Sequence, residues 1–214
     1  MFLFTNDKKY QLIGKSTADF LGKDDWFLSI GRLYNYFTKA MDLRPNSDEG
    51  KVEALAAFGK ADKALLAQLK SITKIDKSSL SIKYDKEKII PFYTLDWLKT
   101  QRKKIGDENF CAVIQTYLED TVVEYLNVTY SQYPVQNLCL SGGVVANIIM
   151  SLNIYERTNF KNIYVMPAMG DDGLAIGSAI LTALEVGEDV SWLKNHIMPF
   201  FGDEYSRKQV KSAL

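Results

Sequence analysis

The sequence predicts an α/β protein whose helix-rich first half is followed by a β-α-β-α unit and a C-terminal helix. Apolar residues recur at helical spacing over most of residues 31–134, whereas short apolar runs alternate with helical segments over residues 135–214. Residues 1–30 contain short β-rich runs, which we expect to form a hairpin or edge strands. The 214 residues are enough for one large domain or two small ones, with a sizeable core.

Two short strands and a helix are expected at the start of the chain. Phe2–Thr5 and Tyr10–Ile13 flank a polar turn, which predicts a hairpin. A helix should begin at about Ile30 and end before Pro45, because proline cannot continue a helix. The apolar face of this helix carries Leu33, Tyr34, Phe37 and Met41.

Further helices are indicated by their capping residues. Asn46-Ser47-Asp48 supplies N-cap chemistry for a helix through Ala57, and Asp62 should cap another that runs to about Ile72. Residues 74–94 are rich in Lys, Ser and Asp, so we expect an exposed excursion there.

The second half alternates between helices and strands, and we expect the strand at Leu138–Leu140 to be buried. Asp107 should cap the longest helix, which ends before Pro134. A strand, a helix, a strand and a helix are then expected, in this order: Asn137–Leu140, Gly143 to about Arg157, Ile163–Val165 and Asp172–Val186. Because a helix joins the two strands, they should be parallel.

Composition is typical of a soluble globular protein of the cytoplasm. Apolar residues make up 47% of the chain, and 26 basic side chains balance 26 acidic ones, so we expect no nucleic-acid partner. No apolar run is long enough to cross a bilayer, and no signal peptide opens the sequence, so no membrane partner is expected. Cys111 and Cys139 lie in apolar stretches, which predicts two buried thiols and no disulfide.

Two glycine-bearing turns are candidate ligand sites. Gly142 and Gly143 follow a predicted strand and open a helix, where backbone amides can approach an anion; a tight turn without a ligand fits the pattern equally well. Gly170-Asp171-Asp172-Gly173 repeats the arrangement after the second strand, at the sheet edge where open α/β sheets bind ligands. One aspartate is explained by capping of the helix, and the other suits a divalent metal.

A third segment, Glu49-Gly50-Lys51-Val52, predicts only a capped helix with solvated charges when it is taken alone. Together with the two glycine turns, however, it resembles O-carbamoyltransferases of the nodulation-protein, cephamycin and tobramycin type. The resemblance runs from about residue 25 to the C-terminus. The matching segments are Ser29–Thr38, Glu49–Gly59, Leu140–Asn147, Pro167–Gly177 and Phe201–Ser206.

The resemblance implies part of a first domain with the actin and hexokinase type of ATPase fold, close to the threonylcarbamoyl-transfer enzyme. It also implies ATP and a divalent metal, Fe or Mg, as cofactors. Carbamoyl phosphate would supply the carbamoyl group through carbamoyl adenylate, and a small hydroxylated molecule would accept it. Asp171 matches the metal-ligand aspartate of the family, whereas no residue is assigned to catalysis. Nucleotide contacts are expected from Glu49, Lys51, Gly142, Gly143, Val144, Asn147, Gly170, Asp172 and Gly173.

Departures from the family pattern predict that the chain is one part of such an enzyme. The His-x-x-x-His segment of the family has no counterpart, since His196 is the one histidine. The initial strands of the ATPase fold and a YrdC-like C-terminal domain are also missing, so we expect these as partners, self-association as a homodimer, and no turnover by the chain alone. The alternatives are a non-catalytic nucleotide-binding module and a remnant of an actin/hexokinase-fold kinase, although the Asp-x-Gly at Asp171 lacks the Ser or Thr of kinases.

Overall fold

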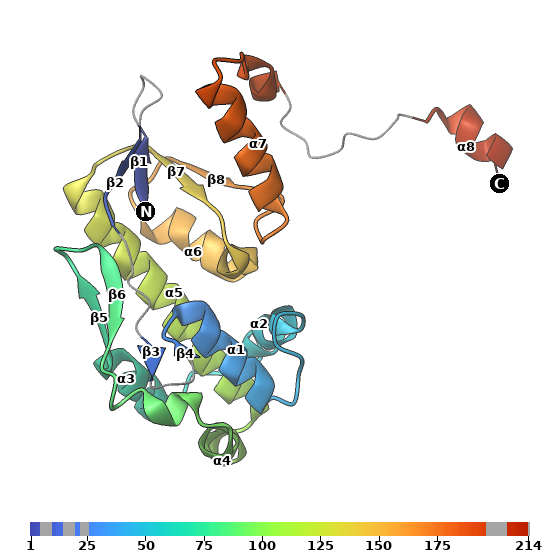
Figure 1. Ribbon diagram of the computed structural model, residues 1–214. Helices are drawn as coiled ribbons and strands as arrows, with labels where there is room; N and C mark the ends of the chain where they lie inside the picture. Colours follow the sequence, from blue (N-terminus) through green and yellow to red (C-terminus); the bar gives the residue numbers. More distant parts are fainter. Residues whose placement is uncertain (5–9, 15–19, 22–25, 196–204, 214) are drawn as a thin grey trace. The chain divides into compact units, whose positions relative to one another are not determined.

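The computed structural model describes residues 1–4, 10–14, 20–21, 26–195 and 205–213. Within these residues the protein is α/β and rich in helix, with small two-stranded sheets (Figure 1). The chain forms two units, Met1–Val165 and Met166–Leu214. Among the described helices, none combines the length and the apolar character that a membrane crossing needs.

Helix α5 (Asp107–Gln132) is the central element of the first unit. Its 26 residues span roughly 39 Å, and it packs against five other helices (Figure 1). These are α1 (Ile30–Ala40), α2 (Glu49–Ala56), α3 (Lys63–Ser71), α4 (Leu95–Ile105) and α6 (Ile148–Arg157). Buried side chains lie on every side of the first half of α5, as expected of a helix enclosed by others.

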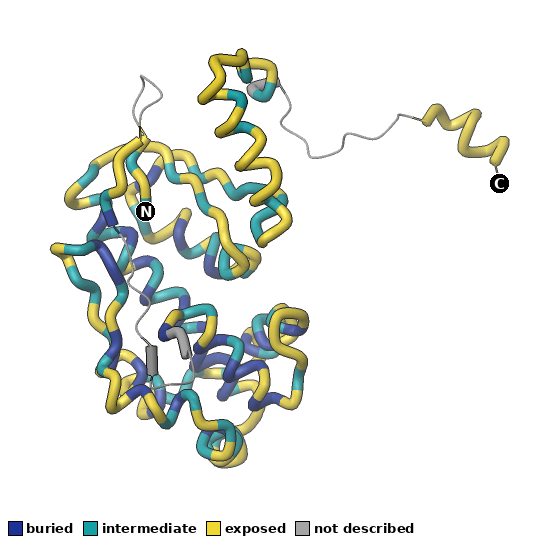
Figure 2. Tube along the Cα trace, viewed as in Figure 1, coloured by how far each residue is buried: buried dark blue, intermediate teal, exposed yellow. Residues whose placement is uncertain are grey.

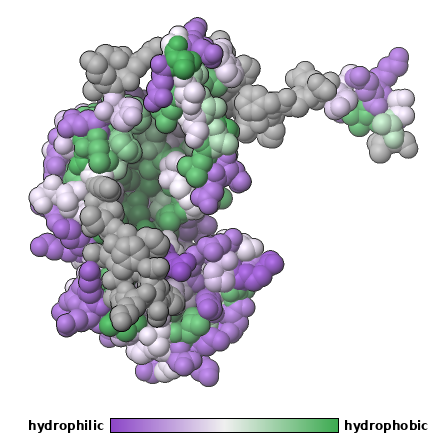
Figure 3. All heavy atoms as spheres, viewed as in Figure 1, coloured by the Kyte–Doolittle hydropathy of each residue, from purple (hydrophilic) through white to green (hydrophobic). Residues whose placement is uncertain are grey.

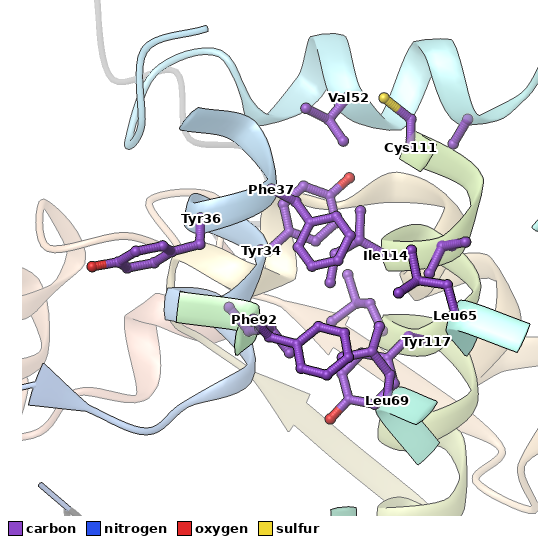
Figure 4. Close-up of a cluster of buried hydrophobic side chains, with 14 of the residues drawn as sticks. Tyr34, Tyr36, Phe37, Val52, Leu65, Leu69, Phe92, Cys111, Ile114 and Tyr117 are labelled. Atoms are coloured by element: carbon purple, nitrogen blue, oxygen red, sulfur yellow. The ribbon is translucent and has the colours of Figure 1, made fainter. Parts of the chain in front are cut away.

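The predicted helix from Ile30 is confirmed as α1, and its apolar face forms the centre of the core. Ser29 caps it, because Ser29 Oγ accepts from the Arg32 amide at 3.1 Å. Phe37 is fully buried and stacks on Phe110 of α5 with ring centroids 4.6 Å apart. Figure 4 shows Tyr34, Phe37 and Ile114 directed toward one another, whereas Tyr36 points away from this cluster. Buried residues are accordingly concentrated on α1 and α5 (Figure 2).

The helices predicted near Ala57 and Ile72 are confirmed as α2 and α3. Asp62 caps α3 as expected, since its Oδ1 accepts from the Leu65 amide at 2.9 Å. Asp48 precedes α2 but makes no capping hydrogen bond to that helix with its side chain. Of these two expected N-caps, only Asp62 therefore caps its helix with its carboxylate.

The expectation that residues 74–94 form an exposed excursion is wrong. This segment contains the antiparallel strands β5 (Thr73–Asp76) and β6 (Ser81–Tyr84) and the 3₁₀ turn η1 (Ile90–Tyr93). Leu80, Ile89 and Phe92 of this segment are buried, while its lysines are exposed. Tyr125 of α5 also donates to the Leu80 carbonyl at 3.0 Å. The charged composition concealed a hairpin that covers one side of α5.

The start of α5 differs from the prediction at one residue. Gly106, with φ +86°, occupies the N-cap position, and Asp107 is the first helical residue. The Asp107 carboxylate accepts from the Arg102 guanidinium at 2.8 and 3.0 Å instead of capping the helix. This ion pair joins the end of α4 to the start of α5 and lowers the pKa of Asp107.

The two strands predicted in the second half are confirmed as β7 (Asn137–Leu140) and β8 (Asn162–Val165), which are parallel. They are not buried strands, because alternate side chains, including Cys139, face away from the core. Of the two cysteines, only Cys111 is buried, and burial raises its pKa to about 12. The predicted helix from Gly143 is interrupted, because η2 (Gly143–Ala146) is a 3₁₀ turn and α6 begins after Asn147.

The predicted N-terminal hairpin is confirmed by β1 (Phe2–Phe4) and β2 (Tyr10–Leu12), which are antiparallel, and β3 (Phe20–Leu21) pairs with β4 (Trp26–Phe27). In the space-filling view, hydrophobic atoms gather around β1 and β2, whereas the surface over α2 is mainly hydrophilic (Figure 3).

The second unit contains α7 (Gly173–Glu185), as predicted, then η3 (Ser191–Asn195) and α8 (Arg207–Ala213). His196 and most of the expected Phe201–Ser206 segment lie outside the described residues.

The stacked pair of Phe37 and Phe110 predicts which substitution unfolds the first unit. Phe37→Ala should lower the free energy of unfolding by about 3–5 kcal/mol, because a fully buried ring is replaced by a cavity. Phe58→Ala is the matched control: Phe58 is 82% exposed, so the change should stay within about 0.5 kcal/mol. Urea titration followed by circular dichroism measures both. Equal effects of the two variants would contradict the core described here.

Candidate functional site

The turn after β7 has a backbone that only glycine adopts readily. β7 and β8 are parallel, and Leu140 pairs with Val165, so both strands end at the same edge of their sheet. Gly142 follows at this edge with φ +111° and ψ 151°, a conformation that is essentially restricted to glycine. The glycine at position 142 is therefore required by the path of the chain itself.

Gly143 is a glycine for which the described residues supply no packing reason. Its φ is ordinary, and a Cβ built on it meets no atom within 4 Å. A side chain would therefore point into open space beside the turn. This open space allows a ligand to reach the backbone at Gly143.

Two backbone amides are presented beside that space. A 3₁₀ turn leaves its first amides without partners inside the turn, and η2 begins at Gly143 and Val144. In the described part of the chain, neither of these two amides donates to a protein acceptor. The amides of Val145 and Asn147, by contrast, donate to the Gly142 and Val144 carbonyls. Neighbouring unpaired amides of this kind form an anion-binding concavity.

Asn147 ends the turn and begins α6. Its Oδ1 accepts from the Met150 amide at 2.8 Å, which is a regular N-cap bond. The same side-chain amide is paired with Gln115 of α5: Asn147 Nδ2 donates to Gln115 Oε1 at 2.8 Å, and Gln115 Nε2 donates to Asn147 Oδ1 at 3.0 Å. The predicted site residue Asn147 is thus held by the protein on two sides.

Gln115 is a residue that the sequence analysis missed. It is only 5% exposed, and it also accepts from the Tyr34 hydroxyl at 2.9 Å and donates to Glu119 Oε1 at 2.8 Å. Burial raises the pKa of Glu119 above its usual value, and burial, reinforced by the charge of Glu53, raises that of Tyr34. A buried polar residue inside the apolar run of α5 was the signal that could have identified Gln115.

Helix α1 packs directly against the turn. A Cβ at Gly31 would lie 2.8 Å from Val144 Cγ2, so a larger residue at position 31 would push the turn away. One turn further along α1, Tyr34 reaches Gln115, and Thr38 Oγ1 donates to the Tyr34 carbonyl at 3.1 Å. The Ser29–Thr38 segment and the Leu140–Asn147 segment therefore meet in the structure.

The start of α6 is occupied by protein groups. Glu53 Oε1 accepts from the Ile149 amide at 2.9 Å, and Asn147 accepts from the next amide. A carboxylate at a helix N-terminus already compensates the positive end of the helix dipole. Because the Ile149 and Met150 amides are already bonded, the expected anion site stays a prediction for the Gly143 and Val144 amides of η2.

Glu49 and Lys51 make local contacts at the start of α2. Lys51 Nζ lies 3.0 Å from Asp48 Oδ1, and Glu49 Oε1 accepts from the Asn46 amide at 2.6 Å. The backbone amide of Arg44 and the Lys51 ammonium lower the pKa of Asp48 to about 2. These contacts are those of a capped helix with charges at the surface.

The Gly170–Gly173 segment belongs to the second unit, where it leads into α7. A Cβ at Gly173 would lie 2.2 Å from the Ala168 carbonyl oxygen, so this glycine is required by close packing, whereas Gly170 faces open space. Asp172 occupies the N-cap position of α7 but makes no capping bond with its side chain, contrary to expectation. Over the described ranges, Asp171 belongs to no group of three or more His, Cys, Asp or Glu side chains suited to a metal.

Comparison with known proteins adds an independent observation. Residues 3–180 match the family described as "Carbamoyltransferase N-terminus". The chain is 49% identical over 210 residues to the uncharacterized protein MJ1058 of Methanocaldococcus jannaschii. The matched region covers 96% of this chain and 34% of that protein. It is 29% identical over 146 residues to the nodulation protein NolO of Bradyrhizobium diazoefficiens, covering 65% and 26% respectively. The chain therefore spans about a third or less of the length of these relatives.

The two glycines of the turn should respond differently to the same substitution. Gly142→Ala should lower the free energy of unfolding by about 1–3 kcal/mol, because alanine is strained at its φ and ψ. Gly143→Ala should change the free energy of unfolding by less than about 0.5 kcal/mol, because its Cβ has room. Thermal and urea unfolding of both variants measure the difference. A larger loss for Gly143→Ala would show that the turn adopts another conformation.

Proposed function

The chain belongs to the carbamoyltransferase N-terminus family, and on this basis we propose that it is the nucleotide-handling part of an O-carbamoyltransferase. In this proposal the enzyme moves a carbamoyl group from carbamoyl phosphate, through carbamoyl adenylate, to a hydroxyl acceptor. The observation that carries the proposal is the open turn at Gly142 and Gly143, with its two unpaired amides. The chain spans about a third of the length of its relative MJ1058, and we propose the activity for the complete enzyme of which this chain is one part.

The geometry suits the phosphate groups of ATP. The amides of Gly143 and Val144 would donate to phosphate oxygens, and the missing side chain at Gly143 would let those oxygens approach. The parallel strands β7 and β8, with a phosphate turn at the end of β7, are also what a nucleotide-binding α/β fold requires. We therefore retain an actin and hexokinase type of ATPase fold as part of the proposal.

The transfer step itself would join two substrates on the complete enzyme. The acceptor hydroxyl oxygen forms a bond to the carbamoyl carbon, the bond from that carbon to the AMP phosphate oxygen breaks, and AMP leaves with the electron pair. The hydroxyl proton passes to a base. This chain would bind and orient the phosphates through backbone N–H groups. Because these donors are uncharged, excluding water from the site does not desolvate a charged donor.

A divalent metal, Fe or Mg, is a further part of the proposal, with Asp171 as one of its ligands. Magnesium is commonly bound by one or two carboxylates together with phosphate oxygens, so a single carboxylate of this chain is compatible with it. When bound, the metal would polarise the carbamoyl carbonyl as a Lewis acid. Asp172 is proposed to contact the nucleotide through the start of α7, as are Gly170 and Gly173.

The remaining elements of the proposal concern partners and location. We propose that the initial strands of the ATPase fold and a YrdC-like domain complete the enzyme, and that a cytoplasmic setting keeps Cys111 and Cys139 reduced. The acceptor would be a small hydroxylated molecule.

Titration calorimetry with a non-hydrolysable ATP analogue tests the binding site. The 214-residue chain should bind the analogue. Gly143→Val should weaken binding by about tenfold or more, equivalent to about 1.4 kcal/mol, because its side chain fills the space that the phosphates need. Ala67→Val, on the exposed face of α3, is the control and should bind like the wild type. Equal affinities of Gly143→Val and the wild type would refute this site.

Substitution of the two neighbouring aspartates distinguishes a metal ligand, Asp171, from a residue proposed to contact only the nucleotide, Asp172. Asp171→Asn should weaken Mn²⁺ binding in the presence of the ATP analogue by about tenfold or more, because an amide is a much poorer ligand for a hard cation. Asp172→Asn should leave Mn²⁺ affinity within about twofold. Electron paramagnetic resonance of free Mn²⁺ gives both affinities. If both variants bind Mn²⁺ equally well, Asp171 is not a ligand.

A further inference from the structure

Gln115 uses every hydrogen-bonding position of its side chain. A glutamine amide has two N–H donors and an oxygen with two lone pairs. Here Oε1 accepts from Tyr34 and Asn147, and Nε2 donates to Glu119 and Asn147, all between 2.8 and 3.0 Å. Because the side chain is buried, the loss of any partner leaves a polar atom unsatisfied, so this arrangement resists rotation.

These hydrogen bonds determine which end of each side-chain amide is the donor and which is the acceptor. Glu119 accepts from Gln115 Nε2 at 2.8 Å and from Asn153 Nδ2 at 3.2 Å, and an ionised carboxylate can only accept. Glu119 therefore fixes which end of the Gln115 amide is the donor. Gln115 in turn fixes the Asn147 amide, whose oxygen must face both Gln115 Nε2 and the Met150 amide. Reversal of the Asn147 amide would oppose two donors.

This series of hydrogen bonds holds the residue at which the glycine-bearing turn η2 meets α6. Asn147 is both the C-cap of η2 and the N-cap of α6, so its orientation decides where the turn stops and the helix starts. The sequence pattern alone favours a continuous helix from Gly143, and the cap at Asn147 prevents it. Gly31 supports the middle of the turn through Val144, while Gln115 supports its end.

We propose that Gln115 is a positioning residue for nucleotide binding: through Asn147 it holds η2 in the conformation that presents the Gly143 and Val144 amides. Gln115 acts from inside the core and does not contact the ligand. The inference rests on the proposed phosphate site for its consequence in affinity. Its structural half, the control of the turn by Gln115, stands on the contacts of the first unit alone.

The test combines two readouts on the 214-residue chain. Gln115→Met keeps the length of the side chain and removes all four hydrogen bonds. It should shift the amide resonances of Gly143 and Val144 and weaken the affinity for the non-hydrolysable ATP analogue by about tenfold. Asn147→Ala should give the same loss, and the double variant should lose no more than either single variant, because both act on one connection.

A general loss of stability is separated from positioning by a control in the core. Leu69→Ala removes a fully buried side chain of α3 and should lower the free energy of unfolding by about 2–5 kcal/mol. It should nevertheless leave the Gly143 resonance and the affinity of the folded protein unchanged. If Gln115→Met does not fold, Tyr34→Phe removes only the hydroxyl bonded to Gln115 and should shift the same resonances to a smaller extent.

The outcomes distinguish failure of the positioning role of Gln115 from failure of the proposed function. Unshifted Gly143 and Val144 resonances in the Gln115 variant, or additive losses in the double variant, would overturn the positioning role. If the wild-type chain does not bind the ATP analogue, the proposed function fails, but the resonance shifts still decide whether Gln115 controls the turn. Shifted resonances with an unchanged affinity would also overturn the proposal, since the turn would then not set nucleotide binding.

Discussion

The enclosure of α5 is the constraint on which the rest of the first unit depends. A 26-residue helix with buried side chains on every side of its first half cannot be stable in water until other elements cover it. Helices from before and after it in the chain do so, together with the β5–β6 hairpin. The stacking of Phe37 on Phe110 and the burial of Leu80 are consequences of this one requirement.

Enclosure also imposes a strict condition on polar groups in the same helix. Gln115 lies in the apolar run of α5, so its four hydrogen bonds have to come from protein groups around it and not from water. Tyr34 comes from α1, and Asn147 comes from the start of α6, while Glu119 is supplied by the next turn of α5. The core therefore specifies the position of the glycine turn as well as the packing of the helices.

The segments that resemble the carbamoyltransferase family have distinct physical roles in this arrangement. Ser29 caps α1, and Gly31 makes room for Val144. The Glu49 and Lys51 side chains make local contacts at the start of α2. Glu53 accepts from the Ile149 amide in the first turn of α6. These residues of the first unit thus support the turn that is proposed to bind the ligand.

The sequence by itself determined the elements whose signals are local. Helical periodicity and capping residues such as Ser29 and Asp62 act within a few residues, and so does the requirement for glycine at position 142. Tertiary structure alone decided that the hairpin of residues 73–84 packs on α5 and that the Asn147 side chain pairs with Gln115. The reason is that the partners are distant in sequence: Gln115 is 81 residues from Tyr34 and 32 from Asn147, so no local pattern specifies their hydrogen bonds.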